Sequence, residues 1–298
     1  MIEKEFPKIS EKNDKFEFTG ETKALGHITL YRIRAKKDII GKDDEVIAKK
    51  GDLGGFIEKE SNLDYHSNAW VYGNAMVYGD AVVSGYAEIY DNARVFERAE
   101  VFVNAKVYGD AQVFDNAKVS GDAEVSESAT VFGNAVVSDY AEVYESAAVF
   151  GNARVFGRAE ILGDAKVYGN AAVYDFAKVY GNAEVFGNAT VSGNAIVSYD
   201  AMVFGNAEVF GNAEVFGNAR VFRKAMVFGN ARVYDNATIF GNARVYDYAK
   251  VYGDAVVSGY AVVYESAEVY DNAEVYNIKV GNPIGKSEKS DAKKAVRH

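Results

Sequence analysis

The chain has 298 residues, 49% of them hydrophobic, which is typical of a folded protein and excludes a disordered one. Cysteine is absent and the three histidines, His27, His66 and His298, lie far apart in the sequence, so we expect no disulfide, no metal site and no cofactor. The net charge is −10, and residues 63–276 alone carry −14, so we expect no binding to nucleic acid, whose phosphates would be repelled.

The first fifteen residues, MIEKEFPKISEKNDK, are charged where a signal peptide would need an apolar core. No run of about 18 apolar residues occurs in the chain, so the sequence predicts no membrane span. We therefore expect a cytoplasmic protein that does not bind a membrane.

Residues 1–62 are expected to form a small N-terminal β cap. They contain two alternating stretches, HITLYRIRA at 27–35 and EVIAKK at 45–50, bounded by Gly, Asp and Lys, which predict short strands. Stacked β-structures have open ends that need such covers. Leu63 and Ile57 lie six and twelve residues before Ala69, so we expect them to continue the alanine positions of the repeat that follows.

Residues 63–276 carry a six-residue repeat, the hexad. Alanine recurs once in every hexad at 35 positions, from Ala69 to Ala273, and a valine, or rarely an isoleucine, follows two residues later. Alanine and valine share one face of an extended strand, whereas the residue between them and the next residue, usually Tyr, Phe or Ser, share the other. The residue between them is often Glu, Arg or Lys, which would be costly to bury. We therefore expect Ala and Val to face the core and the aromatic rings to face outward.

The outward aromatic position has a longer, 18-residue period. Every third hexad from Tyr72 holds eight tyrosines among twelve positions, and the set from Tyr78 holds eight phenylalanines among twelve. These sets define a tyrosine face and a phenylalanine face, and the set from Ser84 defines a third face. The segregation predicts an all-β, triangular β-solenoid of about 12 coils, each with three four-residue strands and two-residue corners such as Gly-Asn.

The phenylalanine face is predicted to be an association surface. Of the residues that precede the valines, ten of twelve are charged on the tyrosine face and only five of twelve on the phenylalanine face. Such a face would exceed the few hundred Å² of apolar surface that a monomer usually exposes. We expect a homo-oligomer with an interface made of Phe96, Phe114, Phe132, Phe150, Phe186, Phe204, Phe222 and Phe240.

The sequence offers few candidates for small-molecule chemistry. Tyr90, Tyr108 and Tyr144 on the tyrosine face could stack sugars or bases, although rings at this spacing also support one another. His66 is the only histidine near a coil and therefore the only candidate for a catalytic base, the alternative being a structural role beside the cap.

Residues 277–298, NIKVGNPIGKSEKSDAKKAVRH, lack the repeat and carry a net charge of +4, so we expect a flexible basic tail. An electrostatic contact between this tail and an acidic repeat is the alternative.

The repeated V-F-G-N-A-R resembles the hexapeptide repeat of left-handed parallel β-helix proteins, and the segment GDLGGFIEKESNL at 51–63 resembles the start of bacterial and phage repeat proteins described as acyltransferases. The resemblance implies a left-handed β-helix. It also implies that an enzyme of this family would use a histidine on a coil and a loop that protrudes from the helix. No histidine lies in residues 67–297, and no loop interrupts the hexads.

We therefore expect a non-enzymatic, self-associating scaffold or binding module. An acyltransferase-like enzyme that uses His66 is the alternative. A second alternative, based on the acidic repeat, is a rod that occupies a host protein partner as a phage inhibitor would.

Overall fold

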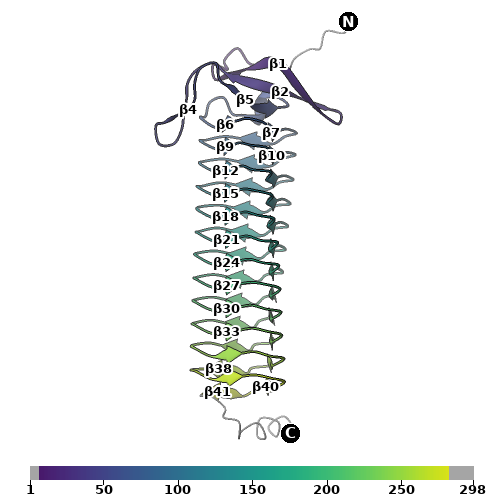
Figure 1. Cartoon of the computed structure of the whole chain (residues 1–298), viewed down its shortest axis with the longest axis vertical. Coiled ribbons are helices and arrows are strands. Elements are labelled where there is room, and N and C mark those ends of the chain that lie inside the picture. Colours follow the sequence, from purple (N-terminus) through teal and green to yellow (C-terminus); the bar gives the residue numbers. More distant parts are fainter. Residues whose placement is uncertain (1–6, 282–298) are drawn as a thin grey trace. The chain divides into compact units, whose positions relative to one another are not determined.

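The computed structural model describes residues 7–281. The chain folds into two compact units, of which the first ends at Ser146 and the second begins at Ala147. In the described residues, all regular structure is β-strand apart from one short 3₁₀ turn, η1 (Glu60–Asn62). Each unit consists largely of coils in which three short strands follow one another, and strands three hexads apart lie in register in neighbouring coils (Figure 1). The predicted all-β solenoid with three hexads in each coil is confirmed.

The segment before the repeat forms two small antiparallel structures within the first unit. β1 (Phe16–Leu25) pairs with β2 (Ile28–Ala35), which pairs with β5 (Leu53–Ile57). Between β2 and β5 the chain forms a hairpin from β3 (Ile39–Ile40) and β4 (Val46–Ala48). This hairpin projects from the cap and lies beside the first coils (Figure 1).

The coils of the first unit stack their strands in three parallel sheets. On the tyrosine face these are β6 (Trp70–Val71), β9 (Glu88–Ile89), β12 (Lys106–Val107), β15 (Glu124–Val125) and β18 (Glu142–Val143). On the phenylalanine face they are β7 (Met76–Val77), β10 (Arg94–Val95), β13 (Gln112–Val113) and β16 (Thr130–Val131). On the third face they are β8 (Val82–Val83), β11 (Glu100–Val101), β14 (Lys118–Val119) and β17 (Val136–Val137).

The second unit repeats this arrangement. Its tyrosine face holds β21 (Glu160–Ile161), β24 (Lys178–Val179), β27 (Ile196–Val197), β30 (Glu214–Val215), β33 (Arg232–Val233), β36 (Lys250–Val251) and β39 (Glu268–Val269). Its phenylalanine face holds β19 (Ala148–Val149), β22 (Lys166–Val167), β25 (Glu184–Val185), β28 (Met202–Gly205), β31 (Arg220–Arg223), β34 (Thr238–Ile239), β37 (Val256–Ser258) and β40 (Glu274–Tyr276). Its third face holds β20 (Arg154–Val155), β23 (Ala172–Val173), β26 (Thr190–Val191), β29 (Glu208–Val209), β32 (Met226–Val227), β35 (Arg244–Val245), β38 (Val262–Tyr264) and β41 (Lys279–Gly281).

The core of each coil consists of the repeated alanines and valines, as predicted. Ala87 and Ile89, for example, have no exposed surface, and the same holds for Ala213 and Val215 in the second unit. The strands are shorter than expected, since most contain only the valine and the residue before it. The chain turns at the fifth residue of each hexad, which has a positive φ, as in Asp91 (58°) and Gly109 (67°). Asp tolerates this left-handed conformation and Gly adopts it without strain, which explains why these residue types recur there.

The junction between the cap and the coils corrects one prediction. Ile57 pairs with Val77, and Leu63 forms a bridge with Val83, so both residues occupy valine positions and not alanine positions. The spacing across this junction is therefore two residues longer than the three hexads of an ordinary coil. The two extra residues are accommodated between Asp64, whose N–H donates to Val83, and Asn68, whose N–H donates to Gly85.

The expected C-terminal tail begins with ordered structure. β41 (Lys279–Gly281) pairs in parallel with β38, and the spacing between the paired residues is one residue shorter than three hexads. Residues 279–281 therefore belong to the last coil, which corrects the prediction of a flexible tail from residue 277. The remaining part of the predicted tail, residues 282–298, lies outside the described residues.

Candidate functional site: a groove beside the tyrosine face

The phenylalanines of the predicted interface point outward and are half-buried. In the first unit, Tyr78, Phe96, Phe114 and Phe132 form a stack with ring centroids 4.9–5.0 Å apart. In the second unit, the stack runs through Phe150, Tyr168, Phe186, Phe204, Phe222 and Phe240 at 4.8–5.2 Å. The ring faces therefore cover one another and leave mainly ring edges at the surface, which gives these residues a role within the coil stack. Their role as an oligomer interface stays a prediction.

The tyrosine face of the first unit has a shorter stack that ends beside the cap. The rings of Tyr90 and Tyr108 are parallel, with centroids 4.7 Å apart. Tyr72 lies on the other side of Tyr90 but meets it edge-on, at 6.4 Å and an interplanar angle of 89°. The ring face of Tyr90 that is turned toward Tyr72 therefore has no parallel partner. Tyr144, the third predicted stacking residue, is separated from Tyr108 by Ser126, which interrupts the series of rings.

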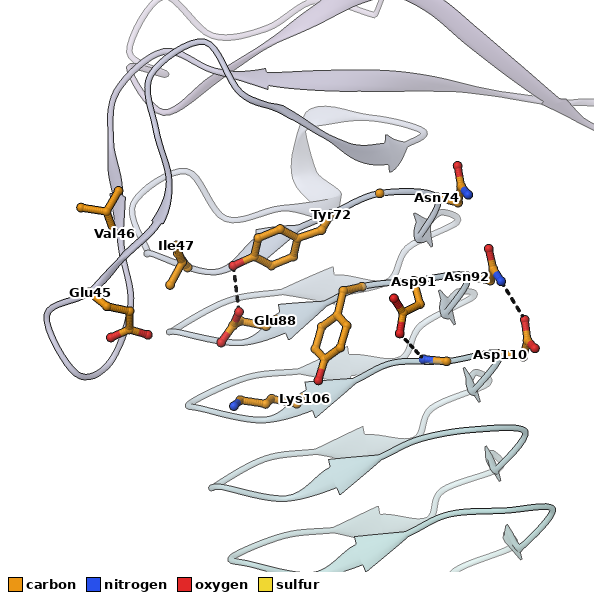
Figure 2. A pocket seen from close by; sticks show the side chains of 13 residues that line it. Glu45, Val46, Ile47, Tyr72, Asn74, Glu88, Asp91, Asn92, Lys106 and Asp110 are labelled. Carbon is orange, nitrogen blue, oxygen red and sulfur yellow. Dashed lines mark hydrogen bonds between the residues drawn. The ribbon is translucent and has the colours of Figure 1, made fainter.

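Tyr72 and Tyr90 line an open groove of about 900 Å³ between the tyrosine face and the cap hairpin (Figure 2). The hairpin contributes Glu45, Val46 and Ile47. The coils contribute Tyr72, Glu88, Tyr90, Lys106 and the corner residues at 73–74, 91–92 and 109–110. The groove thus brings together an acidic loop from the cap and the outward residues of β9 and β12.

The hairpin is held beside the coils by contacts at its tip. Lys42 forms an ion pair with Asp122, a corner residue that also accepts a hydrogen bond from the Asn104 side chain at 3.2 Å. Within the hairpin, the Gly41 N–H donates to the Glu45 carbonyl at 2.8 Å, and the Asp43 N–H donates to the Glu45 carboxylate at 3.0 Å. These contacts fix the position of Glu45 at the edge of the groove.

Most polar groups of the groove already have one partner each. The Tyr72 hydroxyl donates to Glu88 at 2.8 Å, the Gly109 N–H donates to Asp91 at 3.2 Å, and the Asn92 side chain donates to Asp110 at 3.1 Å. Figure 2 shows all three bonds. Asp91 and Asp110 take part in corner contacts that recur along the coils, as in the bond from Gly253 to Asp235, so their bonds are structural.

The two tyrosines of the groove act as neutral groups. Burial raises the pKa of the Tyr72 phenol, and the hydrogen bond to Glu88 raises it further. Burial also raises the pKa of the Tyr90 phenol, with smaller contributions from Tyr108 and Glu124. Both phenols stay protonated at physiological pH, so they offer ring faces and hydroxyl donors and do not act as bases.

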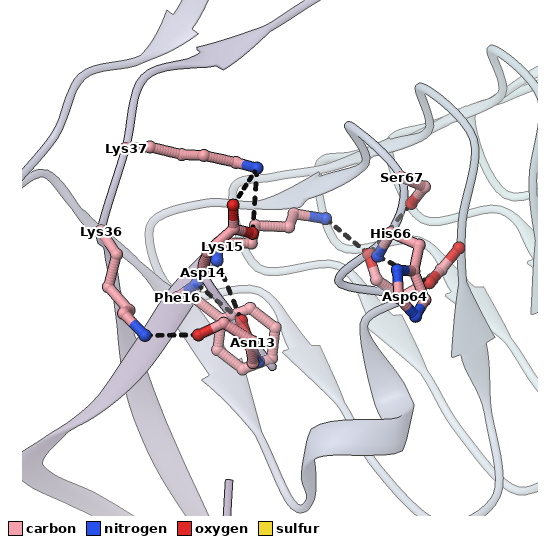
Figure 3. Close-up of polar contacts among 9 residues, drawn as sticks. All are labelled: Asn13, Asp14, Lys15, Phe16, Lys36, Lys37, Asp64, His66 and Ser67. Atoms are coloured by element: carbon pink, nitrogen blue, oxygen red, sulfur yellow. Dashed lines mark hydrogen bonds and ion pairs between the residues drawn. The ribbon is translucent and has the colours of Figure 1, made fainter. Parts of the chain in front are cut away.

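His66 lies outside this groove, on the two-residue insertion beside the cap (Figure 3). Its side chain is exposed, and its ring packs against Tyr65 with centroids 4.1 Å apart. Its backbone N–H donates to the Asp64 carboxylate at 2.9 Å, whereas within residues 7–281 no group forms a hydrogen bond with its imidazole.

Lys15 is a buried charged residue that the sequence does not single out. Its side chain has no exposed surface, and its amine donates to the Asp64 carbonyl at 2.8 Å (Figure 3). Burial lowers the pKa of this amine to about 7, although the nearby Asp64 carboxylate opposes the shift. Because the side chain is buried and bonded to the segment that follows the cap, we assign it a role in joining the cap to the first coil.

The sequence predicted Tyr90 and Tyr108 as residues that could stack a ligand. It did not predict the three hairpin residues of the groove, nor the coil residues Glu88 and Lys106. Glu88 and Lys106 occupy an ordinary outward position of the repeat, and only the docked hairpin distinguishes them from their equivalents elsewhere. Among residues 7–281, no group of acidic or histidine side chains is arranged to hold a metal ion, and no helix is long and apolar enough to cross a membrane.

The fold and the repeat define the class of protein, a repeat β-solenoid with aromatic ladders. Three segments of the chain, residues 69–85, 183–199 and 249–265, match the model of the YdcK beta solenoid repeat family. These segments cover a minor part of the chain, so the chain is similar to this family in its repeats. A search of curated proteins finds no match.

Proposed function

We propose that the protein is a non-enzymatic binding module whose groove holds a ligand carrying an organic cation, such as a guanidinium or alkylammonium group. The observation that carries this proposal is the ring of Tyr90, which has a parallel partner on one side only and lines the groove together with the carboxylates of Glu45 and Glu88. A cation over such a ring is attracted by its quadrupole, by about 0.5–2 kcal/mol.

The charges around the groove favour the same class of ligand. Its lining has four carboxylates, Glu45, Glu88, Asp91 and Asp110, and a single amine, that of Lys106. Glu45 and Glu88 each accept one hydrogen bond from the protein, which leaves acceptor capacity for a ligand N–H. A ligand of about ten non-hydrogen atoms would then bind with a dissociation constant of roughly 0.1–1 mM.

The second unit contains a guanidinium held in the way that we propose for the ligand. Arg232 lies over the ring of Phe216 at 5.3 Å and donates from Nε to Glu214 at 2.9 Å. Glu214 and Phe216 occupy the same hexad positions on the tyrosine face as Glu88 and Tyr90. A carboxylate and a ring at these two hexad positions can therefore hold a guanidinium, and in the groove the position of Arg232 itself is occupied by Lys106.

Agmatine, the decarboxylated form of arginine, is a probe for this proposal. Chemical shift changes in a titration of the ¹⁵N-labelled protein would measure its binding. We expect wild type to bind agmatine and Tyr90→Ala to bind it at least tenfold more weakly. Tyr252→Ala is the matched control, because Tyr252 lies on the same face but in the stack of the second unit. The proposal is wrong if wild type does not bind agmatine or if Tyr90→Ala binds it equally well.

An acyltransferase-like activity would depend on His66. The exposed position of its ring is compatible with access of a substrate, but the groove and its tyrosines lie elsewhere on the first unit. Binding of acetyl-CoA measured by calorimetry, with loss of the signal in His66→Ala, would support this alternative. We expect no heat of binding.

A further inference from the structure

Lys106 is unusual among the cations of the tyrosine face. It lies in register between two carboxylates, Glu88 in the coil before and Glu124 in the coil after. Each of these carboxylates accepts a hydrogen bond from a tyrosine hydroxyl, Glu88 from Tyr72 at 2.8 Å and Glu124 from Tyr108 at 2.9 Å. Within residues 7–281, Lys106 forms no ion pair and no hydrogen bond through its side chain.

The other cations at this position of the described tyrosine face are all paired with a carboxylate one coil away. Lys178 contacts Glu160 at 2.8 Å, Arg232 contacts Glu214 at 2.9 Å, and Lys250 contacts Glu268 at 3.0 Å. The absence of a partner is thus a property of the coil that faces the hairpin and not of the repeat. It leaves three N–H donors at the floor of the groove, where Figure 2 shows the side chain extending toward the hairpin side below Glu88.

An unpaired ammonium group in a groove with carboxylates calls for an anionic group on the ligand. A carboxylate fits a lysine ammonium by a charge-assisted hydrogen bond, which is stronger than a neutral one. The cation of the same ligand would lie near Glu45, Glu88 and the side of the Tyr90 ring that has no parallel partner. The two charges of the ligand are then matched by opposite charges along the same wall of the groove.

We propose that the ligand is amphoteric and that Lys106 binds its carboxylate, which makes a basic α-amino acid, free or at the C-terminus of a peptide, the class of ligand. This inference rests on the proposed cation site and specifies its ligand. Lys106 acts here as the residue that determines specificity for the carboxylate, while Glu45, Glu88 and Tyr90 bind the cation.

The pair of L-arginine and agmatine tests this inference, since the two molecules differ only in the carboxylate. We expect wild type to bind L-arginine about tenfold more tightly than agmatine. Lys106→Met should remove this preference by weakening L-arginine binding about tenfold, without weakening agmatine binding. Lys178→Met, which removes a paired lysine of the same face, should keep the preference.

Each outcome separates the two proposals. Equal affinities of wild type for L-arginine and agmatine, or a preference that survives in Lys106→Met, would overturn the carboxylate site while the cation site stands. If neither molecule binds, the cation site fails, and the carboxylate site fails with it. Comparison of L-arginine with Gly-Gly-Arg and with Gly-Gly-Arg-amide distinguishes a free amino acid from a C-terminal residue. If the ligand is a free amino acid, both peptides should bind more weakly than L-arginine. If the ligand is a C-terminal residue, only the amide should bind weakly. Folding of the variants is checked by their far-ultraviolet circular dichroism.

Discussion

The tyrosine face carries the same pair of hexad positions in both units, yet it uses them differently. In the second unit, Glu214 and Arg232 pair with each other and cover the aromatic ladder. In the first unit, the equivalent Glu88 is bound by the Tyr72 hydroxyl, and the equivalent Lys106 is left without a partner. Two features beside the coils of the first unit accompany this difference: the cap hairpin shares a groove with Glu88 and Lys106, and Tyr72 is the first ring of its ladder. The same two hexad positions can thus form an ion pair in one coil and remain unpaired with each other in another.

The largest expected effect concerns the free energy of unfolding, which we expect to depend on pH through a buried lysine of the first unit. Lys15 is the only charged side chain with no exposed surface among residues 7–281, and it belongs to the first unit. Its pKa is about 7 in the folded state and near 10.5 in the unfolded chain, so the unfolded chain binds the proton more strongly between these values. The free energy of unfolding should therefore rise with pH from 7 to 10.5, by on the order of 2 kcal/mol between pH 7 and 9, and be lower and constant below pH 7.

Lys15→Met should abolish this rise. Urea unfolding followed by the fluorescence of Trp70 measures it, because Trp70 is the only tryptophan and is fully buried in the first unit. Lys178→Met, an exposed lysine of the second unit, is the control and should leave the slope unchanged. A wild-type stability that does not change between pH 7 and 9 would contradict the assignment.

A second prediction compares the phenylalanine and tyrosine faces. If the phenylalanine face is the oligomer interface, Phe186→Lys should weaken self-association at least tenfold, because it places an unpaired charge in an apolar contact. Tyr180→Lys makes the same change on the tyrosine face and should have no effect on association. Light scattering over a range of concentrations measures both variants. A wild-type protein that stays monomeric at high concentration would show that the stacked rings serve the coil alone.

The smallest expected effect comes from a variant that would give Glu88 and Lys106 of the first unit the ion pair that Glu214 and Arg232 form in the second unit. Tyr72→Phe removes the hydroxyl that binds Glu88, so that Glu88 becomes free to pair with Lys106, as Glu214 pairs with Arg232. We expect the affinity for L-arginine to fall about threefold, because the ligand must then displace an exposed ion pair, which is worth less than about 1 kcal/mol. Tyr252→Phe is the control, since Glu268 already pairs with Lys250. An unchanged affinity in Tyr72→Phe would mean that Glu88 does not compete for Lys106.

The repeat made the fold predictable from sequence. Ala87 and Ile89 face the core because the residue between them, Glu88, is charged and would be costly to bury, and Tyr90 therefore faces outward with Glu88. The 18-residue period of Tyr and Phe was enough to assign each strand to a face. The prediction failed where the period changes. Leu63 pairs with Val83 because two extra residues follow it, and no repeated neighbour in the sequence marks that shift.

The groove could be predicted only in part. Tyr90 was recognisable as an aromatic residue that could stack a ligand, because its position in the repeat fixes its orientation. The stretch around Glu45 was recognisable as a strand, but its docking beside Tyr72 depends on tertiary contacts such as that of Lys42 with Asp122, far apart in sequence. The unpaired amine of Lys106 could not be predicted, because Lys250 occupies the same hexad position on the same face and pairs with Glu268.

The three-hexad coil links the length of the chain to the identity of its surfaces. In the second unit, Phe204, Phe210 and Phe216 occupy the same hexad position but lie on three different faces. Loss of one hexad from this unit would keep every alanine and valine in the core, yet it would move every later outward side chain to a neighbouring face. Loss of three hexads would remove one coil and leave the faces as they are. Selection on any one face therefore restricts changes in length to whole coils, although folding alone would tolerate steps of one hexad.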